Sequence, residues 1–190
     1  MHKIDEIVLQ ENNFSSFNEM QKKVLEKGVF EKNLVISSPT ASGKTIVLEL
    51  AALNCILNKK KKVVYTCPLR ALASEHYNDF KRKYAKKFGI RAALSIGDFD
   101  SSSTYLKDYD IIFSTNEKVD SLLRHKAEWL SSVGLLVIDE IHELDSDRGP
   151  TLEMVVTKMR FVIPNIQLVA LSATIPNSKE LSEWLGADLV

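Results

Sequence analysis

The sequence predicts an α/β fold, a doubly wound and mostly parallel sheet with helices on both faces. Short apolar runs typical of buried strands alternate along the chain with longer segments of helical periodicity. Polar, chemistry-bearing segments follow several of the strands, which would gather them along one edge of a parallel sheet. No linker, repeat or low-complexity tract interrupts the 190 residues, so we expect a single domain over residues 1–190.

The composition is that of an ordinary globular domain. It is 45% hydrophobic and 26% charged, and Lys plus Arg and Asp plus Glu both total 25, so any affinity for nucleic acid must come from local placement of charge. No apolar run approaches the roughly 20 residues that span a bilayer, and no signal-peptide core is present. We therefore expect an intracellular protein with no membrane partner. Cys55 and Cys67 lack metal-ligand spacing and are interpreted as reduced, structural thiols.

The amino-terminal third begins with a short helix and leads into the first strand. Ser16 and Glu19 have capping-box spacing, which predicts a short amphipathic helix that ends at Gly28. This helix and its surroundings form an amino-terminal region of about residues 1–30. A strand is expected at residues 33–36, then a largely buried helix after residue 44, and a second strand at residues 63–66. The intervening Lys59–Lys62 run is interpreted as a solvated turn.

The rest of the chain continues the alternation. Apolar residues at helical intervals predict a helix from Leu69 to Phe88, and Gly89 ends it. Further strands are expected at residues 91–95, 110–114, 133–138 and 166–171.

The most informative segment has the pattern of a phosphate-binding loop. It consists of Pro39, Thr40, Ala41, Ser42, Gly43, Lys44 and Thr45, between a predicted strand and a predicted helix. There, backbone N–H groups and the helix N-terminus can hold a triphosphate, Lys44 can reach its β and γ oxygens, and Thr45 can ligate Mg²⁺. Ser38 stands where the pattern usually has glycine. The alternative is a helix-capping turn with a solvated Lys44.

Two acids follow the predicted strand at residues 133–138. Ligands of open α/β sheets bind outside the carboxyl ends of the strands, so Asp139 can hold the metal ion there. Glu140 can orient and deprotonate an attacking water, which makes Glu140, Lys44 and Asp139 the candidate catalytic residues and Thr45 and Asp139 the candidate metal ligands. The alternative is an acidic turn that caps the next helix.

Other motifs follow in a recognisable order. They are Pro68–Glu75, Gly97-Asp98, Thr115–Arg124, Asp139–His142, Arg148–Glu153 and Ser172–Asn177. Together with the phosphate loop, they resemble the first RecA-like motor domain of superfamily-two DExH-box helicases of the Ski-like group. Within that group the chain is similar to the archaeal Hel-type DNA repair helicases, from about residue 14 to residue 185. Ile96 departs from this pattern, because related sequences often have threonine there.

The resemblance implies roles around the nucleotide. Gln21 would read the adenine of ATP, since an amide can both donate to and accept from the base; a solvated helix glutamine is the alternative. Ser172 and Thr174 would couple the nucleotide site to nucleic-acid binding. Their hydroxyls are expected to hydrogen-bond back toward the Asp139–His142 segment, with His142 as a partner; a helix-capping turn is the alternative.

The resemblance also implies a track for a nucleic-acid strand. Its expected residues lie in loops or at strand ends, where they can contact phosphates without reading sequence, although each charged one can equally be an ordinary surface residue. They are Pro68, Arg70, Gly97, Thr115, Asn116, Lys118 and Arg124.

We therefore expect the ATP-binding, Mg²⁺-dependent motor domain of a 3′-to-5′ DNA helicase in repair or replication, acting on single-stranded or forked DNA. A second RecA-like domain, in the same or a partner chain, would supply the arginine finger and the other half of the ATP cleft. That second domain and the accessory domains are expected to lie outside these residues. An RNA helicase of the same group and a nucleotide-gated binding module without turnover remain alternatives. A P-loop GTPase is disfavoured because Asn58-Lys59 does not continue into a guanine motif.

Overall fold

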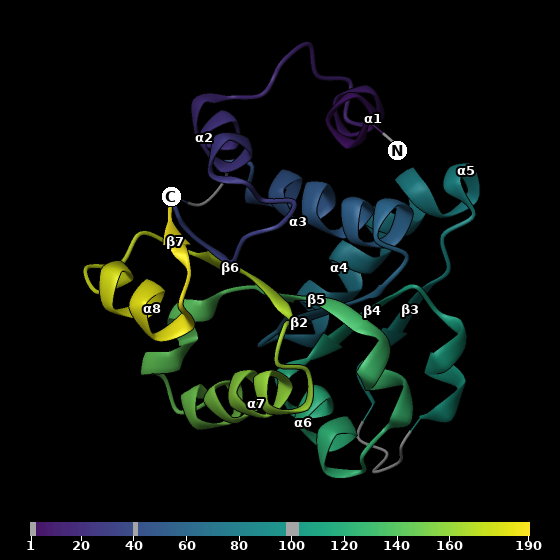
Figure 1. The fold of residues 1–190 in the computed structure, drawn as a ribbon, viewed down its shortest axis with the longest axis vertical. Helices are drawn as coiled ribbons and strands as arrows, with labels where there is room; N and C mark the ends of the chain where they lie inside the picture. Colours follow the sequence, from purple (N-terminus) through teal and green to yellow (C-terminus); the bar gives the residue numbers. More distant parts are fainter. Residues whose placement is uncertain (1–2, 40–41, 98–102) are drawn as a thin grey trace.

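A seven-stranded sheet organises the chain. The computed structural model describes residues 3–39, 42–97 and 103–190, and the pairings between its strands are parallel. The strand order is β3-β4-β2-β5-β6-β1-β7 (Figure 1). This arrangement confirms the doubly wound parallel sheet. The strands are β1 (Leu34–Ser37), β2 (Lys62–Cys67), β3 (Ala92–Ser95), β4 (Ile111–Thr115), β5 (Val133–Ile138), β6 (Gln167–Ser172) and β7 (Asp188–Leu189).

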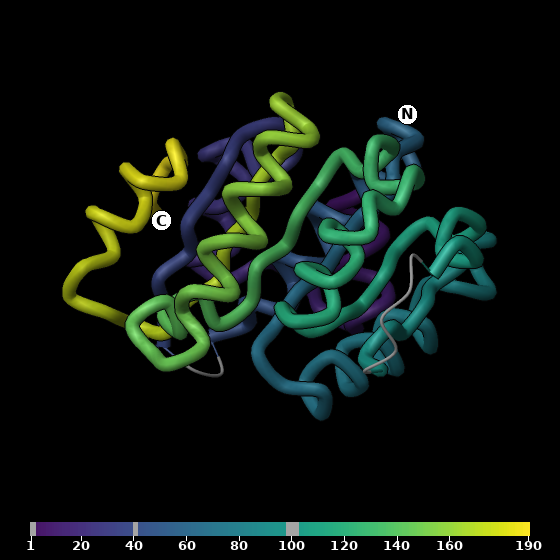
Figure 2. The backbone as a smooth tube through the Cα atoms, turned by 90° about the horizontal axis from the view of Figure 1, so that it is seen from below, coloured from purple at the N-terminus to yellow at the C-terminus, as the bar shows by residue number. Residues whose placement is uncertain are grey.

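Helices cover both faces of the sheet (Figures 1 and 2). One buried apolar cluster joins the first face to the helices α1 (Ile4–Glu11), α2 (Glu19–Lys27), α3 (Lys44–Leu53) and α4 (Arg70–Phe80). A second cluster joins the other face to α6 (Asn116–Arg124), α7 (Gly149–Val162) and α8 (Ser178–Leu185). Strand β1 shows why two clusters form: Leu34 and Ile36 belong to the first and Val35 to the second, as strand alternation requires.

The helix predicted near residue 19 is present, but its cap differs from the prediction. The N-cap is Asn18, whose side chain accepts a hydrogen bond from the backbone N–H of Gln21. The side-chain oxygen of Gln21 in turn accepts a hydrogen bond from the backbone N–H of Asn18. The capping box is therefore shifted two residues from the predicted Ser16–Glu19 pair, because asparagine and glutamine meet the same hydrogen-bonding requirement. Gly28 ends α2 in the left-handed conformation with φ of 93°, as predicted.

The long helical segment before β3 also follows the prediction. Helix α4 continues through a π-helical turn (Lys81–Ala85) into α5 (Lys86–Phe88), and Gly89 ends it with φ of 66°. Helix α3 is buried along most of its length and likewise runs into a π-helical turn (Asn54–Asn58). Short 3₁₀ segments occur at Thr104–Asp108, Glu128–Ser132 and Ile141–Asp145.

Two elements escape the sequence prediction. Helix α1 packs Ile4 and Val8 into the first apolar cluster, although its short amphipathic pattern was not predicted. Strand β7 has only two residues and pairs with β1 at the sheet edge. Two residues are too few to show the alternating pattern by which a strand is recognised in a sequence. Cys55 and Cys67 are buried and unbridged, as expected. Among the described residues, no helix is long and apolar enough to cross a membrane.

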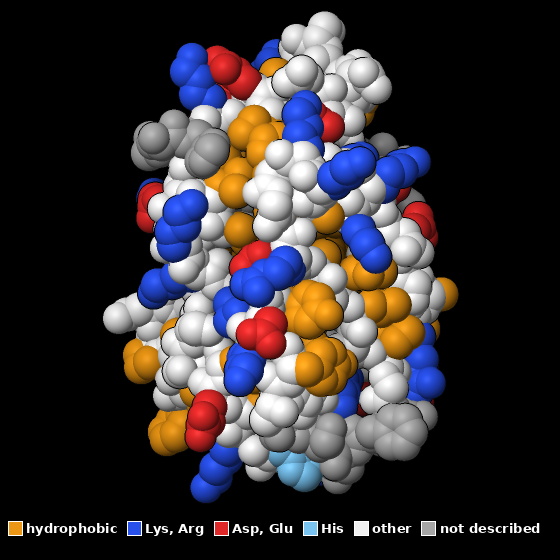
Figure 3. Space-filling model, turned by 90° about the vertical axis from the view of Figure 1, so that its right-hand side faces the viewer, with side chains coloured by type: hydrophobic (Ala, Val, Ile, Leu, Met, Phe, Trp, Pro, Cys, Tyr) orange, Lys and Arg blue, Asp and Glu red, His pale blue; other side chains and the backbone are white. Residues whose placement is uncertain are grey.

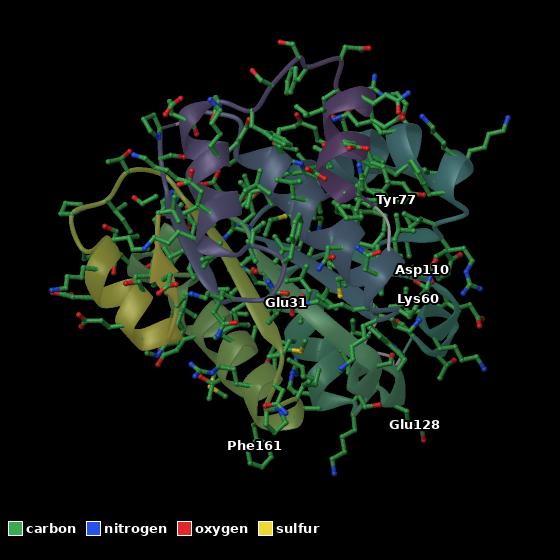
Figure 4. All side chains as sticks on the ribbon, turned by 45° about the horizontal axis from the view of Figure 1, so that its top comes forward. Glu31, Lys60, Tyr77, Asp110, Glu128 and Phe161 are labelled. Atoms are coloured by element: carbon green, nitrogen blue, oxygen red, sulfur yellow. The ribbon has the colours of Figure 1, made fainter. Side chains whose placement is uncertain are left out.

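Charges of both signs lie on the face of the molecule that Figure 3 draws. On the face drawn in Figure 3, Lys and Arg side chains are scattered among apolar and acidic ones. Figure 4 labels Glu31, Lys60 and Asp110, which precede β1, β2 and β4 and so mark the edge at the amino ends of the strands. At that edge the Lys59 ammonium lies 3.1 Å from the Glu31 carboxylate. Phe161, 86% exposed, projects from the last turn of α7 (Figure 4).

A buried acid ties three helical segments together. Glu49 of α3 is 1% exposed, and its carboxylate accepts hydrogen bonds from the Lys83 ammonium at 2.7 Å and the Tyr84 hydroxyl at 2.7 Å. Asn12, at the end of α1, donates to the same carboxylate at 2.6 Å and accepts from Lys83 at 2.8 Å. A buried carboxylate requires such partners, so these contacts hold α1 against the helix that follows the phosphate loop.

We predict that Lys83→Met lowers the free energy of unfolding by about 3 kcal/mol, because it leaves the Glu49 carboxylate buried without its cation. The matched control is Lys86→Met, the same change at an exposed position of the adjoining helix. Urea unfolding of both variants measures the difference. Equal stability of the two variants would contradict an important role for this ion pair.

Candidate nucleotide site and nucleic-acid groove

The predicted phosphate loop connects the end of β1 to the start of α3. Gly43 is the N-cap of α3 with φ of 86°, a conformation that favours glycine, and Lys44 and Thr45 form the first turn. The loop carbonyls hold the lysine: the Lys44 ammonium donates to the backbone oxygens of Ser38 at 2.7 Å and Pro39 at 3.1 Å. Thr40 and Ala41, two of the predicted loop residues, lie outside the described residues.

Ser38 braces this loop. Its hydroxyl lies 2.7 Å from the hydroxyl of Ser42, and its backbone N–H donates to the Ser172 carbonyl at the end of β6. The serine that replaces the usual glycine therefore adds a hydrogen bond across the loop. Its backbone also anchors the loop to a neighbouring strand.

Gln21 lies beside the loop. It is 3% exposed, its side-chain oxygen accepts from the Asn18 N–H at 3.0 Å, and its amide nitrogen lies 3.3 Å from the Gly43 carbonyl, to which it donates. The amide predicted to read adenine thus also caps α2 and contacts the phosphate loop. A cavity of about 300 Å³ adjoins it, lined by Phe14, Ser16, Asn18, Gln21, Ser42, Gly43 and Ile46.

The two acids follow β5 at the same edge of the sheet. Asp139 is 6% exposed; one carboxylate oxygen accepts from the Glu140 N–H at 2.9 Å and the other from the Tyr65 hydroxyl at 2.7 Å. Glu140 has a left-handed backbone with φ of 53°, a strained conformation for a non-glycine residue. Such strain at a sharp turn directly after a buried strand is typical of functional residues.

Partial burial and the neighbouring Asp139 carboxylate raise the pKa of Glu140 above its ordinary value. Lys44 and His142 act in the opposite direction. A carboxylate with a raised pKa is a better proton acceptor, which suits a general base.

His142 links the acid pair to the end of β6, but the contact is not made by the Ser172 or Thr174 hydroxyl, as was predicted. Its Nδ1 accepts a hydrogen bond from the Ala173 N–H at 3.4 Å and lies 3.3 Å from a Glu140 carboxylate oxygen. The Ser172 hydroxyl is buried and has no hydrogen-bond partner among the described residues, and Thr174 is exposed. Among the described residues, the expected contact of the Ser172 hydroxyl with His142 is therefore absent, and the backbone N–H of Ala173 contacts His142 instead. The coupling role of Ser172 and Thr174 stays a prediction.

A second concavity lies further along the same edge, after β2 and β4. It is a groove of about 610 Å³, and the nucleic-acid residues predicted from the sequence line it with one exception. Arg70, Lys118, Arg124 and Arg148 place basic groups along it, and among the described residues that line it Glu117 is the one acid. Its lining residues are Pro68, Leu69, Arg70, Ile96, Gly97, Thr115, Glu117, Lys118, Ser121, Arg124 and Arg148.

Asn116 is the exception. It is fully buried, and its side-chain oxygen accepts a hydrogen bond from the Thr66 hydroxyl of β2 at 2.6 Å. In this structure it faces the sheet interior, because the chain enters α6 at this position and turns the side chain inward. Thr115, one residue earlier, caps α6 by accepting from the Lys118 N–H.

Sequence reasoning missed three residues of these sites. Arg148 lines the groove and donates to the Pro68 carbonyl at 2.6 Å. Tyr65 and His76 both reach Asp139. Arg148 follows the acid pair in a recognised motif and could have been included, whereas no local pattern distinguishes Tyr65 or His76 from ordinary core and helix residues.

Comparisons with known proteins agree with this arrangement. The family model for DEAD/DEAH box helicases matches residues 18–181. The chain is 49% identical to an ATP-dependent DNA helicase Hel308 of Methanocaldococcus jannaschii over 178 residues, which are 90% of this chain and 15% of that protein. It is 46% identical to the protein of the same name from Pyrococcus abyssi over 190 residues, covering 99% of this chain and 26% of that protein.

A solved structure shares the fold. The crystal structure of the DUF1998 helicase MrfA superposes with a TM-score of 0.78 at 23% sequence identity, over 100% of this chain and 32% of that one. The fold is that of a RecA-like α/β domain, and the loop predicted to bind phosphate lies at the edge of its sheet. The chain belongs to the DEAD/DEAH box helicase family. It spans about a quarter or less of the Hel308 proteins described above.

We predict that Glu140→Gln stabilises the protein at neutral pH. The raised pKa means that the folded state binds the Glu140 proton more tightly than the unfolded state, so the ionised carboxylate destabilises the fold at neutral pH. This penalty is lost as the pH falls from the raised pKa of the folded state to the ordinary pKa of the unfolded state, and the advantage of the variant should disappear with it.

Thermal unfolding at neutral and mildly acid pH measures this difference. Glu153→Gln, the same change at an exposed glutamate of α7, is the control and should show no such pH-dependent gain. A Glu140→Gln protein less stable than the wild type at neutral pH would show that the carboxylate is stabilised in the fold.

Proposed function

We propose that this chain is the ATP-binding amino-terminal motor domain of an ATP-dependent DNA helicase that moves 3′-to-5′ along single-stranded or forked DNA during repair or replication. One observation carries the proposal. The phosphate loop with its acid pair and the basic groove lie on the same edge of one sheet, served by neighbouring strands. The similarity to proteins named ATP-dependent DNA helicase supports DNA as the polymer.

For the nucleotide, the residues present fit ATP with Mg²⁺. Thr45 and Asp139 offer the hard oxygen ligands that Mg²⁺ prefers, and Lys44 already donates to loop carbonyls, contacts that it can exchange for phosphate oxygens. When bound, Mg²⁺ would neutralise phosphate charge. Glu140 would accept the proton of the attacking water, and the cavity beside Gln21 would take the base.

For the strand, the groove offers phosphate contacts. Arg70, Lys118, Arg124 and Arg148 provide positive charge, and Pro68, Gly97 and Thr115 provide backbone and short side chains. Contacts of this kind position a polymer without reading its sequence. An RNA strand presents the same phosphates, so direct competition between the two polymers is needed to separate them.

We propose further that residues 1–190 act as one RecA-like domain that works with a second such domain, in the same or a partner chain. An arginine finger from that domain would contribute about 10³- to 10⁵-fold in rate. Closure of the cleft on ATP and its opening after hydrolysis would shift the strand between two grips. A polypeptide of these 190 residues should therefore bind ATP but hydrolyse it slowly.

The first test is Mg²⁺-dependent ATP binding and turnover, with and without single-stranded DNA at low salt. We expect clear binding, very slow turnover and loss of binding in Lys44→Ala, because the lysine charge faces the phosphates. Lys86→Ala, at an exposed lysine, is the matched control. Rapid, DNA-stimulated turnover would mean that this chain assembles a complete ATP site by itself, and absence of binding would refute the proposal.

The groove has its own test. Arg124→Gln should weaken single-stranded DNA binding and reduce the slope of log affinity against log salt by about 0.7, the value for one phosphate contact on a single strand. Arg82→Gln is the control, because Arg82 pairs with Asp79 as Arg124 pairs with Asp120, but outside the groove. An RNA of equal length that competes better than DNA would favour the RNA helicase alternative.

A further inference from the structure

A buried tyrosine contacts the carboxylate at the centre of the candidate metal site. The Tyr65 hydroxyl donates to Asp139 Oδ2 at 2.7 Å, and Tyr65 itself is 0% exposed. Tyr65 lies on β2, the strand next to β5, three residues before the motif that begins at Pro68. Strand β2 lies on one side of β5, whereas β1, which leads into the phosphate loop, lies on the other side. The contact therefore reaches Asp139 from the side opposite to the phosphate loop.

The tyrosine ring is held firmly in place. It packs against the rings of His76 and Phe113, with centroid separations of 5.3 Å and 5.2 Å. A phenol hydroxyl keeps its proton at neutral pH, so Tyr65 remains a hydrogen-bond donor to Asp139. His76 Nε2, from α4, lies 3.5 Å from the same Asp139 oxygen.

These contacts restrict how Asp139 can act. Its Oδ2 faces Tyr65 and His76, while its Oδ1 accepts from the Glu140 N–H. A carboxylate held at both oxygens cannot rotate freely about its terminal torsion. Hydrogen bonds from outer partners to a metal-binding carboxylate fix its orientation and commonly matter for metal affinity.

We propose that Tyr65, assisted by His76, is a positioning residue that fixes the Asp139 carboxylate for the nucleotide-bound divalent cation. This inference rests on the proposed function, in which Asp139 holds that cation. Its rival is a purely structural role, in which the hydroxyl only satisfies a buried hydrogen bond. The rival predicts a change in stability without a change in metal affinity.

The test is the affinity for Mn²⁺ of the protein bound to a non-hydrolysable ATP analogue, measured from the free-ion signal in electron paramagnetic resonance. Tyr65→Phe should weaken Mn²⁺ binding by about 10- to 100-fold. Binding of the analogue without metal should be unchanged. Tyr84→Phe is the matched control, because Tyr84 is equally buried and donates to a different acid, Glu49, at the same 2.7 Å.

Each outcome has one meaning. Wild-type Mn²⁺ affinity in folded Tyr65→Phe would overturn the inference, as would an equal loss in Tyr84→Phe. If Tyr65→Phe does not fold, His76→Ala replaces it, since His76 is only partly buried; it should also weaken Mn²⁺ binding, and an unchanged affinity overturns the inference. Failure of the wild type to bind the analogue would instead refute the proposed function, so the two failures are distinguishable.

Discussion

The central position of β5, between β2 and β6, is the constraint on which both sites depend. Asp139 and Glu140 leave β5 at its carboxyl end, so each neighbouring strand reaches them from one side. The Asp139 N–H donates to the Thr66 carbonyl of β2, and the Ala173 N–H after β6 donates to His142. Hydrogen bonds between parallel strands fix their register. The register therefore decides which residues of β2, β5 and β6 lie side by side at the carboxyl ends of these strands.

The same register links the phosphate loop and the groove to this centre. Strand β1 pairs with β6, and the Ser38 N–H donates to the Ser172 carbonyl, which sets the loop beside the acid pair. On the other side β2 carries Tyr65 toward Asp139 and then continues into Pro68, which lines the groove. The candidate nucleotide site and the groove therefore share β2, and Arg148, in the segment after the acid pair, donates a hydrogen bond to the Pro68 carbonyl.

Much of this could be predicted because the signals are local. The buried strands, the buried helix after Lys44 and the glycine stops at Gly28 and Gly89 depend on periodicity and on backbone freedom within a few residues. The observed contacts differ from the expected ones where the outcome depends on distant neighbours. The Asn116 side chain accepts a hydrogen bond from Thr66 of another strand, and the buried Ser172 hydroxyl has no partner among the described residues.

The sequence by itself determined the alternation of strands and helices, the order of the motifs and the residue types that can hold phosphate and metal, since these follow from spacing along the chain. Only the tertiary structure decided which side chains meet. It brought Tyr65 and His76 to Asp139, added Arg148 to the groove and tied Glu49 to Lys83. The physical reason is that contacts between residues far apart in the chain depend on strand order and packing, which no local pattern records.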